Sequence, residues 1–249
     1  MPSRTSCMVK TLMRPEGLGK LLESIRRYYP ELPVIVVDDS PEPYPEVSAR
    51  FPFVHHQTFP FDVGIGHCLN WVLDTVDADY VVLLEDDFQF CEKTDIPRLV
   101  VPVKTGLYDI MGGGCMNMNN GAQLQRFVGR FRFVPVNEDD MTVEIDHFDV
   151  DQLQGITPCD VALNFFAARV DVLKDLGWDE ELKVARHMDF FLRARAAGLT
   201  VGYHPKVLIE HHTYQDSWQY AELRSQRLPT FQQMFYDKHG LTEAQVPVT

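Results

Sequence analysis

Two short apolar runs constrain the fold of this chain more than any other feature of its sequence. Residues 33–38 (PVIVVD) and 79–84 (DYVVLL) are apolar at nearly every position and have the length of a strand. A strand without polar alternation must be covered on both faces, as happens in parallel sheets flanked by helices. The two runs therefore predict an α/β fold around a mostly parallel sheet.

The residues around these runs alternate between strand and helix patterns. Apolar residues recur at helical spacing after Pro15, and Pro30 ends that pattern. The alternation predicts a doubly wound, Rossmann-like sheet with right-handed crossovers. The expected strands are residues 6–11, 33–38, 53–59 and 79–84, and the expected helices are residues 15–29 and 66–75.

The pattern changes after about residue 105. Short alternating runs at residues 130–136 and 141–145 predict an antiparallel portion, and the polar, aperiodic residues 146–158 predict a mobile loop that orders over a bound donor. The later expected elements are strands at 160–169, 200–203 and 207–210 and helices at 170–176 and 187–197.

One compound domain covering residues 1–249 explains this organisation most simply. We expect two halves, over about 1–105 and about 106–215, and an extension over 216–249 whose end, from residue 241, is loose.

Composition excludes several classes of protein. A formal net charge of −13 argues against a nucleic-acid partner. The five cysteines are scattered and without CxxC spacing, so we expect reduced, mostly buried thiols. No apolar run has the length needed to span a bilayer and no signal peptide is evident, which predicts a cytoplasmic protein. The oligomeric state is open.

Acidic and histidine clusters follow three of the expected strands. In open parallel sheets ligands bind outside the carboxyl ends of the strands, so these clusters should meet in one crevice. Three adjacent carboxylates repel one another unless a cation lies among them, and their oxygens suit Mg²⁺ or Mn²⁺ bridging to a diphosphate. A solvated acidic turn is the alternative. The clusters are Asp38-Asp39, Glu85-Asp86-Asp87 and His211-His212.

Several motifs together resemble a known family. The segments VVDDS (36–40) and LLEDDF (83–88) resemble the nucleotide-binding half of GT-A glycosyltransferases of the large family-2-like group. The segments DVALNFFAAR (160–169), GWD (177–179) and ARHMDFF (185–191) are similar to the vertebrate β-1,4-N-acetylgalactosaminyltransferases of the ganglioside-synthase type. The resemblance runs from about residue 7 to residue 212. It implies a GT-A fold whose acceptor side is antiparallel. In such a fold residues of about 1–105 would be the nucleotide-binding half and residues of about 106–215 the metal and acceptor half.

The resemblance implies an inverting transfer from a UDP-sugar to a glycan hydroxyl, with Mn²⁺ or Mg²⁺. It gives Asp87 the role of principal metal ligand, completed by His211 or His212. The expected contacts of the nucleotide and its ribose are Thr11, Arg14, Asp38, Asp39, Glu85 and Asp86.

The resemblance also implies a catalytic base and an acceptor side. Asp189 falls where these inverting enzymes carry the carboxylate that takes the acceptor proton, and Asp160 and Asn164 fall near the acceptor. Two departures are evident: Leu69 stands where the relatives have a basic residue, and Asp189 replaces the usual glutamate.

Two other functions fit part of the pattern. A nucleotidyltransferase also combines acidic metal ligands with an α/β domain, but it usually needs a glycine-rich phosphate loop, and residues 10–14 (KTLMR) are basic without glycine. A non-catalytic nucleotide- or sugar-binding module is the second alternative. The complete set of acidic triplet, base position and late histidines favours the transferase.

Overall fold

The computed structural model describes residues 4–119, 121–125, 127–184, 186–214 and 217–243. The first hundred residues alternate strands and helices as predicted. Their elements are β1 (Thr5–Thr11), α1 (Pro15–Tyr28), β2 (Val34–Asp38), α2 (Pro45–Ala49), β3 (Val54–Thr58), α3 (Ile65–Thr75), β4 (Tyr80–Glu85), β5 (Phe88–Gln89) and α4 (Ile96–Lys104).

The remainder of the chain adds antiparallel strands and the last helices. Its elements are β6 (Ile110–Asn117), β7 (Gln123–Leu124), β8 (Gly129–Pro135), β9 (Met141–His147), the 3₁₀ turn η1 (Val150–Gln152), β10 (Thr157–Cys159), β11 (Phe166–Arg169), α5 (Val170–Leu176), α6 (Arg186–Ala196), β12 (Val201–His211) and α7 (Ser217–His239).

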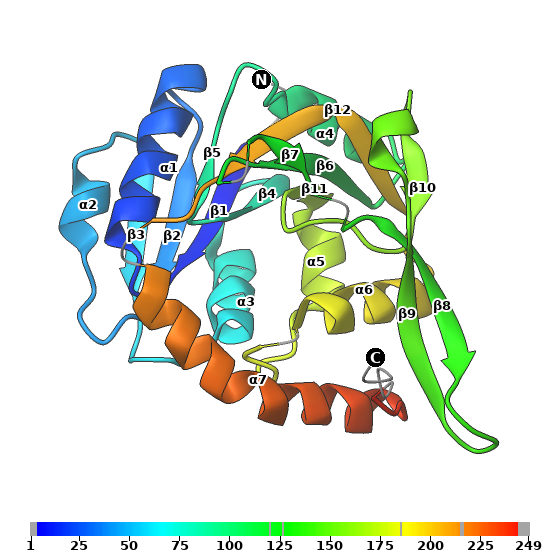
Figure 1. Cartoon of the computed structure of the whole chain (residues 1–249). Helices are drawn as coiled ribbons and strands as arrows, with labels where there is room; N and C mark the ends of the chain where they lie inside the picture. Colours follow the sequence, from blue (N-terminus) through cyan, green and yellow to red (C-terminus); the bar gives the residue numbers. More distant parts are fainter. Residues whose placement is uncertain (1–3, 120, 126, 185, 215–216, 244–249) are drawn as a thin grey trace.

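A ten-stranded mixed sheet forms the centre of the molecule, in the order β10-β12-β6-β11-β4-β1-β2-β3, with β5 on β12 and β7 on β6. The strands β3, β2, β1 and β4 are parallel, whereas β11 runs antiparallel to both β4 and β6. A separate ribbon of β8 and β9 projects from one end (Figure 1). The predicted α/β class with a mostly parallel sheet and an antiparallel portion is confirmed.

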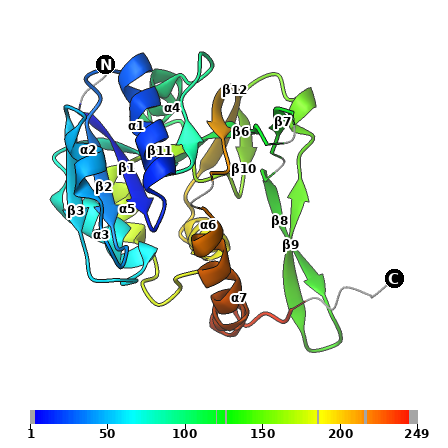
Figure 2. The same ribbon diagram turned by 60° about the vertical axis from the view of Figure 1, so that its left-hand side comes forward.

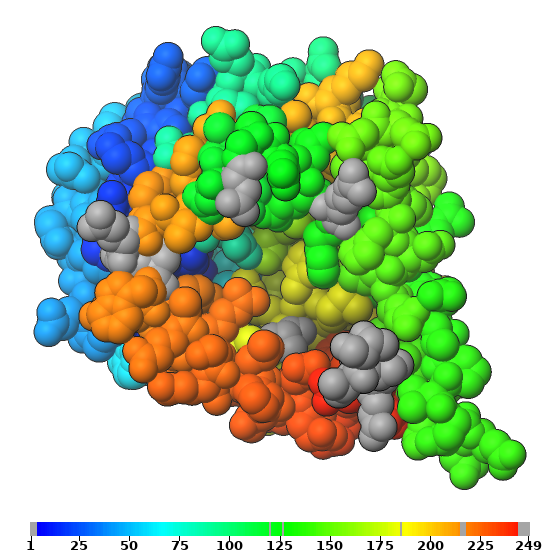
Figure 3. All heavy atoms as spheres, in the orientation of Figure 1, coloured from blue at the N-terminus to red at the C-terminus, as the bar shows by residue number. Residues whose placement is uncertain are grey.

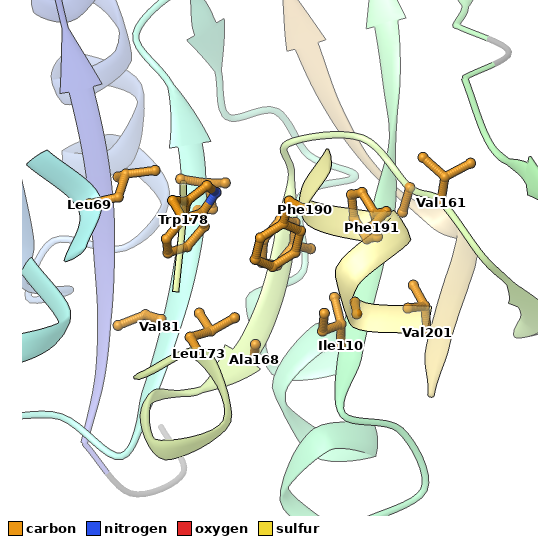
Figure 4. Packing of buried hydrophobic residues seen from close by; sticks show 14 of the residues in the cluster. Leu69, Val81, Ile110, Val161, Ala168, Leu173, Trp178, Phe190, Phe191 and Val201 are labelled. Atoms are coloured by element: carbon orange, nitrogen blue, oxygen red, sulfur yellow. The ribbon is translucent and has the colours of Figure 1, made fainter. Parts of the chain in front are cut away.

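Alternating side chains of β1 fill two cores, one on each face of the sheet. Cys7 and Val9 contribute to the core with α1 and α4, and Met8 contributes to the core with α3, α5 and α6. In the second core the rings of Trp178 and Phe190 stack with centroids 4.9 Å apart (Figure 4). This packing fixes α6 against the sheet.

The pairing of β5 with β12 joins the two halves where the acidic triplet ends. β5 begins directly after Asp87, and the antiparallel register places His211 opposite Phe88. The end of β12, which is the last strand of the chain, is thereby brought beside the acidic triplet at the end of β4.

Four expectations differ from the structure. The expected loop 146–158 contains the end of β9, η1 and β10, because β10 pairs with β12. Residues 160–165 are not a strand, and the two expected late strands form the single strand β12, with a register shift between His204 and Leu208. The helices α2, α4 and α7 were not predicted. Residues 244–249 of the expected loose end lie outside the described residues.

α7 runs along the bottom of the molecule in Figure 1, below α3 and α6, and it lies beside α6 in both views (Figures 1 and 2). Among the described residues no helix is long and apolar enough to cross a membrane. All five cysteines are free, and four of them are buried, as predicted.

Candidate active site

A cavity of about 380 Å³ lies where the carboxyl ends of β1 and β4 meet the end of β12. In the space-filling view it is a hollow between the first turns of α7 and the segment around β7 (Figure 3). The predicted site residues that line it are Arg14, Glu85, Asp87, Asn164 and His211. Lys10 also lines it, and the lining residues that were not predicted include Asp62, Lys183, Arg186, His187, Tyr220, Arg224 and Arg227.

Asp87 and His211 form a pair on the cavity wall. His211 Nε2 lies 3.4 Å from Asp87 Oδ2. Although burial alone would raise the pKa of Asp87, the hydrogen bond from His211 and the charge of Arg14 hold that pKa below its usual value. Asp87 Oδ1 is buried and has no hydrogen-bond or ion-pair partner among the described residues.

The two late histidines have different surroundings. His212 Nε2 lies 3.0 Å from Glu210 Oε2, and its ring does not line the cavity. Its backbone N–H donates to the carbonyl of Asp87, which ties the end of β12 to the triplet. Of the two candidates, the structure therefore places His211 beside the predicted metal ligand.

Asp87 and His211 fit a divalent cation. An unpartnered carboxylate oxygen beside an imidazole nitrogen offers two ligands that Mn²⁺ accepts, and the carboxylate oxygen alone suits Mg²⁺. Within the described ranges no group of three or more His, Cys, Asp or Glu side chains could hold a metal ion by itself. The remaining ligands would come from a diphosphate and water, as is usual for Mg²⁺ bound with nucleotides.

Arg14 binds two members of the triplet, Asp86 and Asp87, from inside the protein. Its Nη1 lies 2.6 Å from Asp87 Oδ2, and its Nε and Nη2 contact Asp86. Thr11 Oγ1 donates to Asp86 Oδ2 at 2.7 Å. Burial raises the pKa of Asp86 to about 6 in spite of Arg14. Thr11 and Asp86 are completely buried and do not line the cavity, so their predicted contact with the nucleotide is not supported.

Asp38 and Asp39 are used by the protein itself. Asp38 accepts hydrogen bonds from the backbone N–H groups of Ser40 and Tyr44, and Asp39 binds Lys10 Nζ at 2.7 Å. Neither side chain is exposed, and neither lines the cavity. The predicted contacts of both carboxylates with a nucleotide therefore lack support in this structure. Their effect on the site is indirect, because Asp39 positions Lys10, which does line the cavity.

The two predicted acceptor-side residues, Asn164 and Asp160, lie in different parts of the structure. Asn164 lies on the cavity, where its Nδ2 donates to Glu85 Oε1 and its Oδ1 accepts from His187 Nδ1 at 2.7 Å. Asp160 lies at the base of the β8–β9 ribbon, where it accepts from the N–H of Phe131 and from Arg195. Asp160 does not line the cavity, so the structure does not support its predicted place beside an acceptor.

The structure also argues against Asp189 as the general base. Its side chain is about 1% exposed, forms ion pairs with Arg193 and Lys238, and lies 2.9 Å from His239 Nε2. These partners hold the pKa of Asp189 far below its usual value, although burial alone would raise it. A base must reach the proton that it removes. Asp189 does not line the cavity and is already paired with three side chains of α6 and α7.

Two features of the sequence could have identified some of the unpredicted cavity residues. Arg186 and His187 lie inside the quoted segment 185–191, next to the residue that was chosen as the base. Tyr220, Arg224 and Arg227 are spaced by four and three residues, which places them on one side of a helix.

The sequence was compared with known proteins and structures. It matches the family "Glycosyl transferase family 2" over residues 6–177. It is 32% identical over 213 residues to beta-1,4 N-acetylgalactosaminyltransferase 2 of Mus musculus and 31% identical over 216 residues to beta-1,4 N-acetylgalactosaminyltransferase 1 of Homo sapiens. Each alignment covers 81% of this chain and 38% of the relative, so the chain spans well under half the length of these proteins.

Two solved structures share the fold at low sequence identity. TarS of S. aureus (residues 1–349) has a TM-score of 0.61 and 16% identity, covering 87% of this chain and 62% of that chain. GalNAc-T7, solved with UDP, GalNAc and Mn²⁺, has a TM-score of 0.64 and 13% identity, covering 94% of this chain and 50% of that chain. At this identity the likeness establishes the architecture alone.

Proposed function

The chain belongs to glycosyl transferase family 2, and we propose that it transfers a sugar, with inversion, from a UDP-sugar to a hydroxyl of a glycan or polysaccharide. UDP-GalNAc is the first donor to test, because the relatives are named for N-acetylgalactosaminyl transfer. UDP-GlcNAc and UDP-Gal follow. The single-domain organisation and the cytoplasmic location remain predictions.

One observation carries this proposal: the Asp87–His211 pair and a group of guanidinium ions face the same cavity. Arg14 and Arg186 line it beside Asp87, and Arg224 lines it from α7. The side chain of Arg186 is only 17% exposed, yet its Nη2 lies 3.9 Å from Oε1 of its carboxylate neighbour Glu85. Burial lowers the pKa of Arg186, and the charges of Arg224 and Arg14 lower it further.

This arrangement suits a diphosphate. The cavity lining as a whole holds more lysine and arginine side chains than carboxylates, so it favours an anion, and arginine matches phosphate oxygens with paired N–H donors. The protein as a whole carries a formal charge of −13, so this positive wall is a local feature. A nucleoside diphosphate would place its phosphates between the arginines and the Asp87–His211 pair.

The residues around a bound donor would have three roles: metal binding, phosphate binding and positioning of the metal ligand. Asp87 and His211 would hold a divalent cation, which as a Lewis acid stabilises the charge that develops on the leaving diphosphate. Arg186 and Arg224 would bind phosphate oxygens directly. Arg14 would hold Asp87 in place through the ion pair at 2.6 Å.

Binding of UDP tests the proposal most directly. We expect calorimetry to detect UDP binding in the presence of Mn²⁺ and much weaker binding in the presence of a chelator. UDP release from UDP-GalNAc, UDP-GlcNAc and UDP-Gal then tests turnover. Binding without UDP release from any donor would favour a non-catalytic module. Release of pyrophosphate from a nucleoside triphosphate would favour a nucleotidyltransferase.

The α7 arginine gives a second, independent prediction. Arg224 has no carboxylate partner among the described residues, so Arg224→Gln removes a phosphate contact without stranding a partner. A hydrogen bond to a charged group contributes about 1.5–3 kcal/mol, and because Arg224 is exposed we expect a loss of only about 5–10-fold in UDP affinity. Arg132→Gln on the β8–β9 ribbon, which changes the net charge equally, should bind UDP like the parent. Equal affinities of the two variants would exclude a phosphate contact by Arg224.

A further inference from the structure

The orientation of α6 determines which of its side chains can face a substrate. Asp189 points to the end of α7, where it meets Lys238 and His239. Successive residues of an α-helix are about 100° apart, so His187, two residues earlier, lies about 200° around the axis. His187 accordingly lines the cavity on the opposite side of α6.

The imidazole of His187 is held in one orientation and one tautomer. Asn164 Nδ2 donates to Glu85 Oε1, so the other amide atom, Asn164 Oδ1, faces His187 as an acceptor. His187 Nδ1 must therefore carry the proton, and the lone pair lies on Nε2. The rings of Phe127 and Phe191, with centroids 5.0 and 5.1 Å away, enclose the imidazole.

His187 Nε2 is buried and has no hydrogen-bond partner among the described residues. A buried acceptor without a partner costs free energy, and such groups in native proteins commonly have a functional explanation. Burial and the charge of Arg186 lower the pKa of His187 to about 3, whereas the carbonyl of Ala162 favours the protonated ring. The free imidazole is consequently neutral at physiological pH and has an unused lone pair.

We propose that His187, and not Asp189, is the catalytic residue that takes the proton from the acceptor hydroxyl. This assignment rests on the proposed function. The acceptor oxygen forms its bond to the anomeric carbon while the bond from that carbon to the diphosphate oxygen breaks. The acceptor proton passes to His187 Nε2, and the electron pair of the broken bond leaves with the diphosphate.

Binding of the donor would prepare His187 for this step. An anionic diphosphate beside Arg186 offsets the positive charge that opposes protonation of the imidazole. Asn164 and Glu85 act as positioning residues, because they orient the ring from the side opposite the reacting nitrogen. The arrangement of a base fixed by a hydrogen bond to a third group is common in enzymes that activate a hydroxyl.

The test compares His187→Gln with the parent in the presence of Mn²⁺. Glutamine retains polar atoms but cannot take the proton, so we expect UDP release from the donor sugar to fall by about 10²–10⁴-fold. The affinity for UDP should stay within about threefold of the parent, since proton removal belongs to the transition state. In His187→Ala, added imidazole should restore part of the lost rate, which a purely structural role would not allow.

The outcomes separate the two levels of the proposal. A His187→Gln variant that turns over at the parent rate, or that loses rate only in proportion to UDP affinity, would overturn the assignment and leave the proposed function intact. A parent protein that neither binds UDP nor turns over any donor would overturn both. If both His187 variants unfold, Asn164→Ser decides: it keeps the imidazole but removes its orienting hydrogen bond, and an unchanged rate would contradict the proposal.

Discussion

Asp87→Ala is expected to abolish Mn²⁺-dependent binding of UDP and to reduce UDP release from a UDP-sugar by at least about 10²-fold. A bound cation that acts as a Lewis acid contributes several kcal/mol, and each 1.36 kcal/mol is about a factor of ten in rate. Asp87 offers an unpartnered buried oxygen and contacts His211, so its loss removes one ligand and the partner that positions the other. Calorimetry with and without Mn²⁺ measures the first effect.

A matched control for this pair lies at the end of β12. Glu210 and His212 also form a carboxylate–imidazole pair, at 3.0 Å, but neither side chain lines the cavity. Glu210→Ala and His212→Ala should therefore bind UDP with the parent's metal dependence, whereas His211→Ala should weaken it. Unchanged metal-dependent affinity in Asp87→Ala would remove the metal from this site.

The position of the acidic triplet could be predicted because it follows from a local pattern. An apolar run covered on both faces must lie within a parallel sheet, and the residues after it must emerge at the carboxyl edge. The family resemblance, now confirmed by the match over residues 6–177, added the order of the motifs. Glu85 and Asp87 accordingly lie on the cavity.

The choice between His211 and His212 could not be predicted because it depends on register. Successive side chains of a strand point to opposite faces, so one of two adjacent histidines must turn away from the triplet. Which one does so is decided by the pairing of β12 with the two-residue strand β5. The sequence of β12 alone carries no information on that pairing.

The roles given to Asp38 and Asp39 illustrate a different limit. A carboxylate at a strand end can bind a ligand or can accept hydrogen bonds from the following loop, and both outcomes have the same local sequence. Here the backbone N–H groups of Ser40, Tyr44 and Gly64 and the amine of Lys10 occupy them. The partners that decide the outcome come from several segments of the chain.

α7 was missed because its sequence lacks a single apolar stripe and contains Pro229, which argues against a helix interior. Its helical structure depends on tertiary contacts at both ends. Near its start, the guanidinium of Arg14 lies 4.3 Å from the centroid of the Tyr220 ring, and Arg227 Nη1 lies 2.5 Å from Asp62 Oδ2. Near its end, Lys238 and His239 bind Asp189.

Asp189→Asn is therefore expected to lower stability and not the chemical rate. The substitution leaves Arg193, Lys238 and His239 without the carboxylate that they share. Breaking a buried ion pair by removing one member costs about 3–5 kcal/mol, and because the three partners are partly exposed we expect a smaller loss, about 2–3 kcal/mol. Urea unfolding of parent and variant measures the difference.

The same ion pairs predict how the difference changes with pH. The pKa of Asp189 in the folded protein is lowered relative to the unfolded chain, so folding favours the ionised carboxylate. Its contribution to stability is fully present above the unfolded pKa of about 3.9 and is lost as the pH falls toward the folded pKa. The difference between parent and Asp189→Asn should be constant near neutral pH and shrink below about pH 4.

A matched substitution isolates the effect of burial. Asp171 pairs with Arg169 at 2.9 Å, but its side chain is 71% exposed, so Asp171→Asn should cost well under 1 kcal/mol.

The rate of UDP release by Asp189→Asn then shows whether Asp189 is a catalytic base or a residue that anchors α7 to α6. If Asp189 took the acceptor proton, Asp189→Asn would slow UDP release by about 10²–10⁴-fold with little change in unfolding. If Asp189 anchors α7 to α6, the folded variant turns over near the parent rate, and its unfolding midpoint falls to a lower urea concentration.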